Sequence, residues 1–479
     1  MIQVIVAYKT SQNELLKKAG ELKNRMEKSF KDLATDKNST FPFVLHATAG
    51  GETHGLLIEK GLSTFALHTA MRKAFSGAFK GAEGDVIVDL ALLDAKDTER
   101  ALEALASLSV LSAWTPVTYG NKAKDKKAPK AISVQVISKL KSQDSNSLSA
   151  RGLKIGEAVN RVRTLADMPA NQLNPGNYRK IVQDFAKERK MKFEFMNIAA
   201  LKKMKAGAFL AVVQADPDTE SGIVHLTVPS KLKKPRQRIC LVGKGLCYDT
   251  GGYNIKTGSY MNGMHRDMTG SAIAFSTTAL LAELHPELEI HCFMAIAENL
   301  ISPTAYKPDE VVIASNGMSI EVMDTDAEGR MALSDTLAIA SLEKPDVIID
   351  FATLTGAAVR SLDTRRAAIF SNRPALAALA VKTGEASGER TWSFPIGEDY
   401  RENLKSDVAD ILQCAHIVNS DHIYAATFLS EFVAKDVPWV HMDLCPAENK
   451  GGLGLVTENT TGFGPRWALE FVEALLTKA

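Results

Sequence analysis

The stretch "RICLVGKGLCYDTGG", Arg238 to Gly252, passes from an apolar run into a loop that holds an acid and a pair of glycines. A short, nearly unbroken apolar run rich in branched residues is typical of a strand that is buried on both faces. Similar runs recur downstream between amphipathic segments, and this alternation predicts a mostly parallel sheet covered by helices on both faces. The further strands are expected at 289–299, 346–354 and 438–445, and helices at 270–284, 331–343 and 423–435.

The first 142 residues have an α/β pattern of their own. Strands are expected at 2–8, 85–93 and 131–137, and amphipathic helices at 13–30 and 97–111. The polar, serine-rich stretch "SQDSNSLSARG" (142–152) is expected to link this part to the rest. The predicted class is α/β, with an N-terminal α/β domain at 1–142, a linker and connecting helix at 143–168, and a larger C-terminal domain at 169–479 with a central, mostly parallel sheet flanked by helices.

Composition narrows the class of protein without naming a function. Of 479 residues, 45% are hydrophobic and 24% are charged, and the formal net charge is +1, so no global charge draws the chain to nucleic acid or to an acidic partner. The five cysteines are scattered and form no Cys-x-x-Cys, which is typical of reduced thiols in the cytosol. Neither a run of about 18 apolar residues nor a signal peptide is visible, so we expect a cytoplasmic protein without a membrane span.

Acidic residues follow two of the strand ends, where open α/β sheets bind their ligands. The second such stretch is "VMDTDAEGRMALSD", Val322 to Asp335, which comes after an Asn-Gly turn that predicts a small hairpin. Asp326 and Glu328 are two residues apart, so they share a face if the segment is extended. Because the apolar spacing of the next helix begins at Met331, we expect both acids to reach one point just before that helix.

Asp249 and Asp267 bring further carboxylates to the same place if the two strand ends are neighbours. Four buried acids cannot all stay ionised without compensating positive charge. Two divalent cations about 3.5–4 Å apart, with bridging carboxylates, are the usual compensation. The alternative is that each acid caps a helix or lines a loop. The convergence of all four at strand ends favours a two-metal site.

Two lysines and an arginine accompany the acids. Lys244 ends the apolar strand, and Lys256 follows the glycine pair. Either lysine can bind a metal as a neutral amine or, as an ammonium, can stabilise negative charge on a carbonyl oxygen; the alternative is a surface side chain. Arg330 lies at the expected helix N-terminus, where an arginine and unpaired N–H groups form an anion site. The alternative for Arg330 is a salt bridge to Asp324 or Asp335.

These segments resemble the leucyl aminopeptidase (cytosol aminopeptidase) family. "VGKGLCYDTGGYNIK" is similar to that family's Gly-Lys-Gly, Asp-x-Gly-Gly and Ile-Lys block, and "MHRDMTGSA" is similar to its Asp-Met-x-Gly segment. "DTDAEGRMALSD" resembles the signature Asn-Thr-Asp-Ala-Glu-Gly-Arg, while "DFATLTGA", "LKSDVADI" and "TGFGPR" match in kind and order. The resemblance covers residues 155–475 and is weak over the first 140, where only the α/β character agrees.

The resemblance implies a two-metal aminopeptidase that hydrolyses N-terminal residues from peptides. Lys244, Asp249, Asp267 and Glu328 would bind the more tightly held ion, and Asp249, Asp326 and Glu328 the exchangeable one, so that Asp249 and Glu328 bridge the pair. The ions would be zinc or manganese, with magnesium as a further candidate. A water that bridges both ions would attack the scissile carbonyl.

The same resemblance assigns the remaining roles. Lys256 would polarise the carbonyl and stabilise the gem-diolate, and Arg330 would hold a bicarbonate ion that acts as general base toward the bridging water. The free amine of the substrate would bind one ion and Asp267. The expected assembly is the family's homo-hexamer, in which the active sites face an interior cavity. The backbone of Ala327, Gly329 and Leu354 would help to hold the anion, and Met264, Thr353 and Gly356 would line the side-chain pocket.

The chain departs from the family pattern near the site. Asp324 stands at a usual Asn, Thr269 at a usual Gly and Arg266 at a usually small residue, which leaves the substrate preference open. Two alternatives to the enzyme remain. A nucleic-acid-binding or regulatory role would draw on the basic stretches 121–130, otherwise expected as a solvated loop, and 231–238, although the net charge argues against it. An inactive structural relative is disfavoured by the intact set of expected ligands.

Overall fold

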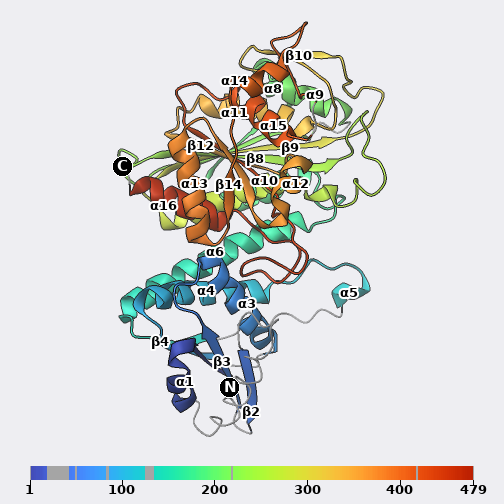
Figure 1. Cartoon of the computed structure of the whole chain (residues 1–479). Helices are drawn as coiled ribbons and strands as arrows, with labels where there is room; N and C mark the ends of the chain where they lie inside the picture. The colour runs from blue at the N-terminus through green and yellow to red at the C-terminus, as the bar shows by residue number, and fades with distance from the viewer. Residues whose placement is uncertain are drawn as a thin grey trace. The chain divides into compact units, whose positions relative to one another are not determined.

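The computed structural model describes residues 2–18, 43–48, 51–81, 86–124, 134–216, 220–416 and 419–477. Two compact units are present, each with a β-sheet of its own, and the predicted α/β class is confirmed (Figure 1). Among the helices of these ranges, none has both the length and the apolar character needed to cross a bilayer. The first unit holds Met1–Asn160, Glu385–Glu389 and Lys450–Thr461, and the second holds Arg161–Gly384, Arg390–Asn449 and Gly462–Ala479.

The first unit is built on a five-stranded sheet of order β2-β3-β1-β4-β5. β2 pairs antiparallel with β3, and the other pairs are parallel. The three predicted strands are present as β1, β4 and β5. β2 and β3 were not predicted from the sequence; in β3, Gly51 and Gly55 interrupt the alternation. The bounds are β1 Ile2–Tyr8, β2 Phe43–Thr48, β3 Gly51–Ile58, β4 Val86–Leu92, β5 Val134–Ile137, α3 Thr64–Gly81 and α4 Ala95–Ala113.

Three predicted segments of this region differ from expectation or leave the described residues. The helix expected at 13–30 begins as α1, Gln12–Lys18, and residues 19–30 lie outside the described ranges. Of the basic stretch 121–130, α5 covers Asn121–Lys124, and the remainder also lies outside them. The stretch 142–152, which its serines predict to be an irregular linker, is instead the beginning of helix α6, Ser142–Ala166.

The glycines of α6 serve a close contact with α4. A Cβ at Gly152 would lie 2.4 Å from the carbonyl oxygen of Glu103, and a Cβ at Gly156 would lie 2.9 Å from that of Ser107. The Ser107 hydroxyl donates to the carbonyl of Gly152 at 2.8 Å. Glycine at these positions therefore lets two helices approach each other, and its presence does not mark a loop.

The second unit is built on an eight-stranded sheet of order β14-β13-β16-β12-β8-β9-β7-β6. Its central pairs β16–β12, β12–β8 and β8–β9 are parallel, and these four strands are the ones that the sequence predicts. The outer pairs β13–β16, β6–β7 and β7–β9 are antiparallel. The bounds are β6 Lys192–Met196, β7 Gly222–Val228, β8 Arg238–Asp249, β9 Glu289–Asn299, β12 Val347–Ala352, β13 Ala367–Ser371, β14 Thr391–Ser393 and β16 Trp439–Asp443.

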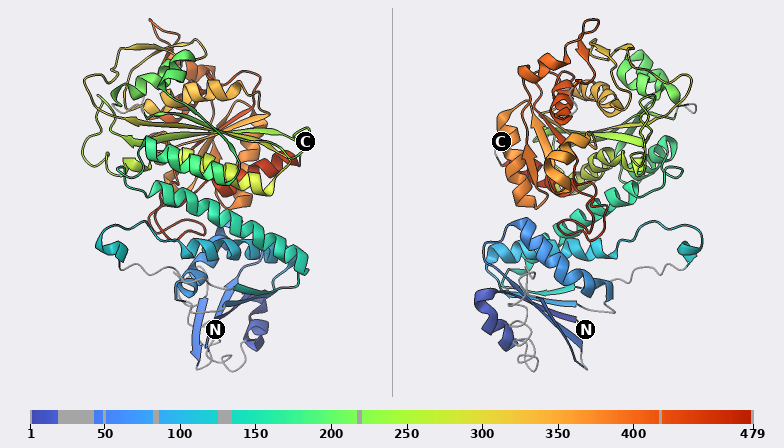
Figure 2. Two further views of the ribbon diagram at one scale, coloured as in Figure 1. Left: turned by 180° about the vertical axis from the view of Figure 1, so that it is seen from behind. Right: turned by 45° about the vertical axis from the view of Figure 1, so that its right-hand side comes forward.

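Helices cover both faces of this sheet, as predicted (Figure 2). α10 (Thr269–Leu284) and α16 (Pro465–Leu476) lie on one face, and α11 (Glu328–Ser341) and α15 (Asp421–Ser430) lie on the other. α10 touches the sheet with its backbone, since a Cβ at Gly270 would lie 2.1 Å from the carbonyl oxygen of Phe351 in β12. The other helices are α7 Pro175–Glu188, α8 Ile198–Lys203, α9 Gly207–Val212, α12 Gly356–Leu362, α13 Pro374–Ser387 and α14 Glu398–Arg401.

A small second sheet, of order β10-β11-β15, contains the predicted hairpin. β10 (Val311–Ile313) and β11 (Ser319–Glu321) pair antiparallel, and β15 (Ile411–Leu412) adds to β11 in parallel. The acidic stretch 322–335 therefore follows a strand that is not paired with β8. Its position is fixed instead by α11, which packs on β8 and β9 through wholly buried side chains such as Met331 and Leu337. Burial of each such side chain contributes about 1.5–3 kcal/mol of stability.

Candidate metal centre

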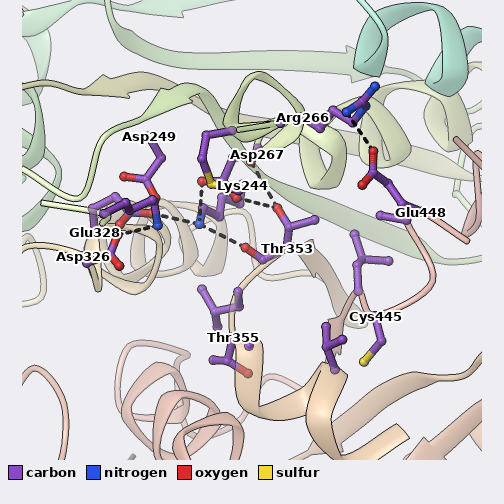
Figure 3. Close-up of a pocket in the computed structure, with 18 of the residues that line it drawn as sticks. Lys244, Asp249, Arg266, Asp267, Asp326, Glu328, Thr353, Thr355, Cys445 and Glu448 are labelled. Atoms are coloured by element: carbon purple, nitrogen blue, oxygen red, sulfur yellow. Dashed lines mark hydrogen bonds and ion pairs between the residues drawn. The ribbon is translucent and has the colours of Figure 1, made fainter. Parts of the chain in front are cut away.

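A cavity of about 380 Å³ lies at the carboxyl ends of the central strands, beside the N-terminal ends of α10 and α11 (Figure 3). β8 ends at Asp249 and its parallel neighbour β12 ends at Ala352, so both strands deliver their following residues to the same edge of the sheet. Six of the charged residues singled out in the sequence line this cavity together: Lys244, Asp249, Lys256, Asp267, Asp326 and Glu328.

Three of the carboxylates form a tight cluster. Asp249, Asp326 and Glu328 each offer an oxygen, and these oxygens all lie within 4.8 Å of one another. Asp326 lies in the loop before α11, as predicted. Glu328 is the first residue of that helix, which thus begins three residues earlier than the apolar spacing from Met331 indicates. The helix N-terminus adds positive potential beside the Glu328 carboxylate.

Lys244 lies inside the acid cluster rather than at the protein surface. Its Nζ atom is 2.9 Å from Oδ2 of Asp267, 2.9 Å from Oε1 of Glu328 and 3.1 Å from the carbonyl oxygen of Thr353, to which it donates. Burial acts to lower the pKa of Lys244, but the charges of Asp267 and Glu328 outweigh burial and raise it. The amine is therefore an ammonium in this arrangement, and it must lose a proton before it can bind a cation.

Lys256 holds the other side of the cluster. Its Nζ atom lies 2.7 Å from Oδ2 of Asp249 and 2.5 Å from Oδ1 of Asp326. Burial again opposes the charged form, yet the pKa of Lys256 is raised because the charges of Asp249 and Glu328 outweigh burial. The side chain is 13% exposed, against 4% for Lys244, so Lys256 is the cation that a molecule entering the cavity can reach.

Burial raises the pKa values of the acids Glu328, Asp326 and Asp267. Burial and the charge of Asp249 raise the pKa of Glu328 to about 8. Burial also raises the pKa of Asp326 and of Asp267 to about 6 each, in the latter case against the charge of Lys244. Within the described part of the chain, Oε2 of Glu328 is buried and accepts no hydrogen bond. An oxygen-rich pocket with an unpaired carboxylate oxygen and raised carboxyl pKa values fits hard or borderline divalent cations.

Neighbouring side chains fix the orientation of the acids. Asn299, the last residue of β9, donates to Oδ1 of Asp249 at 2.9 Å and to the carbonyl of Thr325 at 3.0 Å. The hydroxyl of Thr353 donates to Oδ1 of Asp267 at 2.7 Å. Such hydrogen bonds to carboxylates hold potential metal ligands in place. Asn299 was not among the predicted site residues, although its place at the end of a predicted central strand was a usable signal.

Asp324, which had no expected role, shapes the loop of Asp326. Its Oδ1 accepts the backbone N–H of Asp326 at 2.9 Å, so it forms an Asx-type turn just before α11. The backbone N–H of Asp324 in turn donates to Oε1 of Gln413 at 3.0 Å. Because an Asn side chain can accept the same bond, the turn does not need a charge at this position.

Arg330 is engaged with a residue that the sequence analysis did not consider. Its Nη2 atom donates to both carboxylate oxygens of Asp421, at 2.8 Å each, and Nη1 donates to the carbonyl of Gln413 at 3.4 Å. The alternative partners Asp324 and Asp335 are therefore wrong. Asp335 instead accepts the backbone N–H of Phe209 at 2.8 Å. Arg330 and Asp421 are separated by 91 residues, so no local pattern could have linked them.

The other expected anion donors have different surroundings. The backbone N–H of Leu354 donates to Oδ1 of Asp443 at 3.0 Å. Leu354 lines the cavity, whereas Ala327, Gly329 and Arg330 are not among its lining residues. A bicarbonate ion at Arg330 would compete with Asp421 for Nη2, and one at Leu354 would compete with Asp443, whereas Nε of Arg330 is buried and has no hydrogen-bond partner among the described residues.

The expected pocket residues Met264, Thr353 and Gly356 do line the cavity. Arg266, a departure from the family pattern, lines it as well and pairs with Glu448 at 2.8 Å. Thr269, another departure, donates from its hydroxyl to the carbonyl of Arg266 and is buried, so it supports the loop. Most of the other residues that line the cavity were not predicted from the sequence. They are Thr355, Val359, Thr364, Leu444, Cys445, Ala447 and Glu448.

Comparison with known proteins gives a consistent family assignment. The family model "Cytosol aminopeptidase family, catalytic domain" matches residues 160–468. A probable cytosol aminopeptidase of Sulfurihydrogenibium sp. is 34% identical over 383 residues, which cover 80% of this chain and 75% of the relative. A mutant of tomato leucine aminopeptidase superposes with a TM-score of 0.86 at 27% identity, covering 98% of this chain and 93% of the other. The bottromycin maturation enzyme BotP in complex with Mn gives 0.80 at 28% identity, with 99% of both chains covered.

Proposed function

The chain belongs to the cytosol aminopeptidase family and is a metal-dependent aminopeptidase, and on this premise we propose that its acid-lined cavity cleaves N-terminal residues from peptides with two divalent ions. The observation that carries the proposal is the convergence of Asp249, Asp326 and Glu328, whose oxygens lie within 4.8 Å of one another, on two lysines and Asp267. Each of these residues stands where the family motif has its ligand or its lysine.

We assign the ligands as the motifs imply. Lys244, Asp249, Asp267 and Glu328 hold one ion, and Asp249, Asp326 and Glu328 hold the other, with zinc or manganese as the metals and magnesium as a further candidate. The manganese complex of BotP supports this choice. When bound, the ions supply Lewis-acid polarisation and a water that is activated near neutral pH.

Lys256 is the residue of the chain that acts on the scissile carbonyl. Its Nζ atom pairs with Asp249 and Asp326. With these acids engaged by cations, Lys256 would be released from both pairs and its ammonium would donate to the carbonyl oxygen of the substrate. Negative charge develops on that oxygen as water attacks, and a preorganised donor in a site shielded from water stabilises such charge strongly.

Asp267 and the cavity wall select the end of the substrate. Thr353 holds Oδ1 of the Asp267 carboxylate through a 2.7 Å hydrogen bond, and this acid would accept a hydrogen bond from the free α-amine while the amine binds one ion. The arrangement would account for cleavage at the N-terminus, because an internal peptide nitrogen has no basic lone pair. The side chain of the first residue then contacts Met264, Thr353 and Gly356.

Three further features complete the proposal. We propose a homo-hexamer whose active sites face an interior cavity and a cytoplasmic location, in line with relatives named cytosol aminopeptidases. In the basic stretch 231–238, Arg236 donates to the carbonyl of Leu476 and Arg238 pairs with Glu289, while Lys231, Lys233 and Lys234 are exposed. The formal net charge of +1 argues against a nucleic-acid-binding role. Mass photometry of the purified chain tests the assembly: a hexamer is expected, and a stable monomer contradicts it.

The function is tested by release of leucine from leucyl amide. Activity is expected with added Mn²⁺ or Zn²⁺ and is expected to vanish after dialysis against a chelator. An N-acetylated leucyl amide serves as the matched control, since it lacks the free amine that Asp267 requires. Hydrolysis of the acetylated substrate at the same rate, or of leucyl amide in the presence of chelator, contradicts the proposal.

A further inference from the structure

Arg330 holds a carboxylate that belongs to the chain itself. Both oxygens of Asp421 lie 2.8 Å from Nη2, and Asp421 opens helix α15, where an acid is also stabilised by the helix N-terminus. Arg330 is buried, and the Asp421 side chain is 28% exposed. Asp421 therefore already places a carboxylate on the guanidinium at which the family motif implies a free anion.

We propose that Asp421 replaces, as a carboxylate fixed to the fold, the free bicarbonate that the family motif implies at Arg330. This inference rests on the proposed function. A tethered carboxylate needs no binding equilibrium to fill the site. Asp421 is then a positioning residue that keeps Arg330 charged and oriented two residues from the ligand Glu328, and peptide hydrolysis does not depend on bicarbonate.

Anion rescue tests the proposal. In CO₂-free buffer with Mn²⁺, wild type is expected to hydrolyse leucyl amide at the same rate with and without bicarbonate. Asp421→Ala is expected to lose about tenfold or more, since it removes a charge-assisted pair in which Nη2 of Arg330 donates to both carboxylate oxygens, and to regain activity with bicarbonate or formate. Asp421→Asn, which fills the same space without charge, is expected to lose activity and to stay unresponsive.

A binding readout separates this inference from the activity of the enzyme. Bicarbonate is expected to raise the melting temperature of Asp421→Ala but not that of wild type. Glu431→Ala is the matched control, because it removes the carboxylate of another pair in the same unit, Arg401–Glu431 at 2.9 Å, and is expected to show no anion response. A bicarbonate requirement in wild type, or an Asp421→Ala variant with no anion response in either readout, overturns the proposal. If wild type is inactive, the proposed function fails, and the melting temperatures still decide the anion site.

A second, independent cluster lies at the opposite end of the sheet. His225 in β7 and His291 in β9 belong to paired antiparallel strands, and Glu343 follows α11. His291 is eight residues from Asn299 along β9, or roughly 26 Å in an extended strand, so the cluster is remote from the cavity. Nε2 of His225 lies 2.9 Å from Nδ1 of His291, which is 3.7 Å from Oε2 of Glu343.

The outer nitrogens of both histidines face carboxylates. Nε2 of His291 lies 3.1 Å from Glu289, and Nδ1 of His225 lies 3.5 Å from Glu194. These acids favour N–H at the outer nitrogens; in that tautomer both inner nitrogens, 2.9 Å apart, offer lone pairs, and the Thr227 hydroxyl lies 3.3 Å from Nε2 of His225. Facing lone pairs repel unless a proton or a cation lies between them. Carboxylate-oriented imidazoles of this kind are typical of histidines that bind a metal.

We infer that His225, His291 and Glu343 bind a divalent cation of the zinc type, through Nε2, Nδ1 and a carboxylate oxygen. Two imidazoles and a carboxylate are a donor set that zinc accepts, with water as a fourth ligand. The half-exposed Glu343 gives the ion access from solvent. Burial lowers the pKa of His225 to about 4, so this ligand is already neutral at physiological pH. The ion would tie β7 and β9 to the end of α11 and so stabilise the fold.

Zinc stoichiometry decides this second proposal. After chelation and reloading with Zn²⁺, wild type is expected to retain one more ion per chain than Glu343→Ala or His291→Ala, as measured by elemental analysis. The variants are expected to melt at lower temperature only in the presence of zinc. His285→Ala is the control, because His285 pairs with Glu287 and Glu473 and takes no part in the cluster. Equal zinc content in wild type and both cluster variants overturns the inference, whatever the activity of the catalytic cavity.

Discussion

A Cβ on Gly329 would lie 2.6 Å from Nζ of Lys244, closer than such atoms approach in proteins. Position 329 of the Asp-Ala-Glu-Gly-Arg motif therefore needs glycine because Lys244 fills the space that a side chain would take, and not because of the backbone conformation of the glycine. Lys244 can contact Glu328 and Asp267 only because residue 329 has no side chain. Three consecutive residues of the motif thus supply a proposed metal ligand (Glu328), the space that Lys244 fills (Gly329) and an arginine (Arg330).

Gly329→Ala is expected to displace Lys244 and to lower the activity about a hundredfold, as misplacement by about 1 Å does in active sites. The measurement is leucyl amide hydrolysis across a Mn²⁺ titration, in which weaker metal binding is expected as well. Gly176→Ala is the control, since the nearest atom to its Cβ would be Oε2 of the flexible Glu220 side chain at 3.3 Å. Full activity of Gly329→Ala would show that Lys244 has no role in the site.

Lys256→Ala is expected to lower kcat by about 10²–10³, the usual effect of removing one donor to a developing oxyanion, while KM changes little. Metal content should equal that of wild type, because Lys256 is assigned to the substrate and not to the ions. Lys307→Ala, which removes an exposed lysine paired with Glu310, is the control. Equal kcat in Lys256→Ala and wild type contradicts the assigned role.

Two substitutions of Asp324 test whether the site needs the hydrogen bond of this side chain or its charge. Asp324→Asn keeps an oxygen that can accept the N–H of Asp326, so activity close to that of wild type is expected. Asp324→Ala removes the turn, and a loss of about tenfold is expected because one hydrogen bond to a charged acceptor is lost. Steady-state kinetics with leucyl amide measures both. Equal losses in the two variants would mean that the charge, and not the turn, is what the site needs.

The metal-free protein is expected to lose stability as pH rises from about 4.5 to 8. Glu328 has a folded pKa of about 8 and an ordinary value of 4.5, so the folded state binds the extra proton throughout that window and the unfolded state does not. Stability from this source is present below pH 4.5 and is lost as pH passes the folded value. Asp267 and Asp326, raised to about 6, act in the same direction at lower pH.

Denaturant unfolding at pH 6 and pH 8, with chelator and with Mn²⁺, measures this effect. The chelated protein is expected to unfold at lower denaturant at pH 8. The metal-loaded protein is expected to lack that loss, because cations replace the protons. A chelated protein that is more stable at pH 8 than at pH 6 would contradict the burial of these acids.

The central strands could be predicted because burial on both faces requires them to be apolar along most of their length. β8, β9, β12 and β16 are covered on both faces, so each is an apolar run that few other structures explain. The outer strands β6 and β7 mix polar and apolar residues, and β14 has only three residues, so no such run marks them. The start of helix α6, residues 142–152, was hidden by its serines and by Gly152, which serves the packing on α4, whereas the rest of α6 falls in the connecting helix that the sequence predicts.

The candidate site likewise contains residues that could be predicted from the sequence and residues that could not. Residues within one motif could be named, because strand ends and helix starts bring them to one edge of the sheet. Contacts that join distant segments could not be predicted. Arg330–Asp421 is the clearest case, since the expected partners of Arg330 were acids close to it in the sequence. The cavity wall at Leu444–Glu448 is likewise supplied by a loop whose position depends on tertiary packing alone.

Re-metallation of the chelated enzyme tests the central claim most directly. Leucyl amide hydrolysis is followed while Mn²⁺ is returned to chelated wild type and to Asp249→Asn, which alters the acid assigned to both ions and keeps its shape. Wild type is expected to recover full activity, and the variant is expected to stay inactive at every Mn²⁺ concentration although it remains folded. Activity in chelated wild type, or full recovery in Asp249→Asn, would contradict a two-ion aminopeptidase site in this cavity.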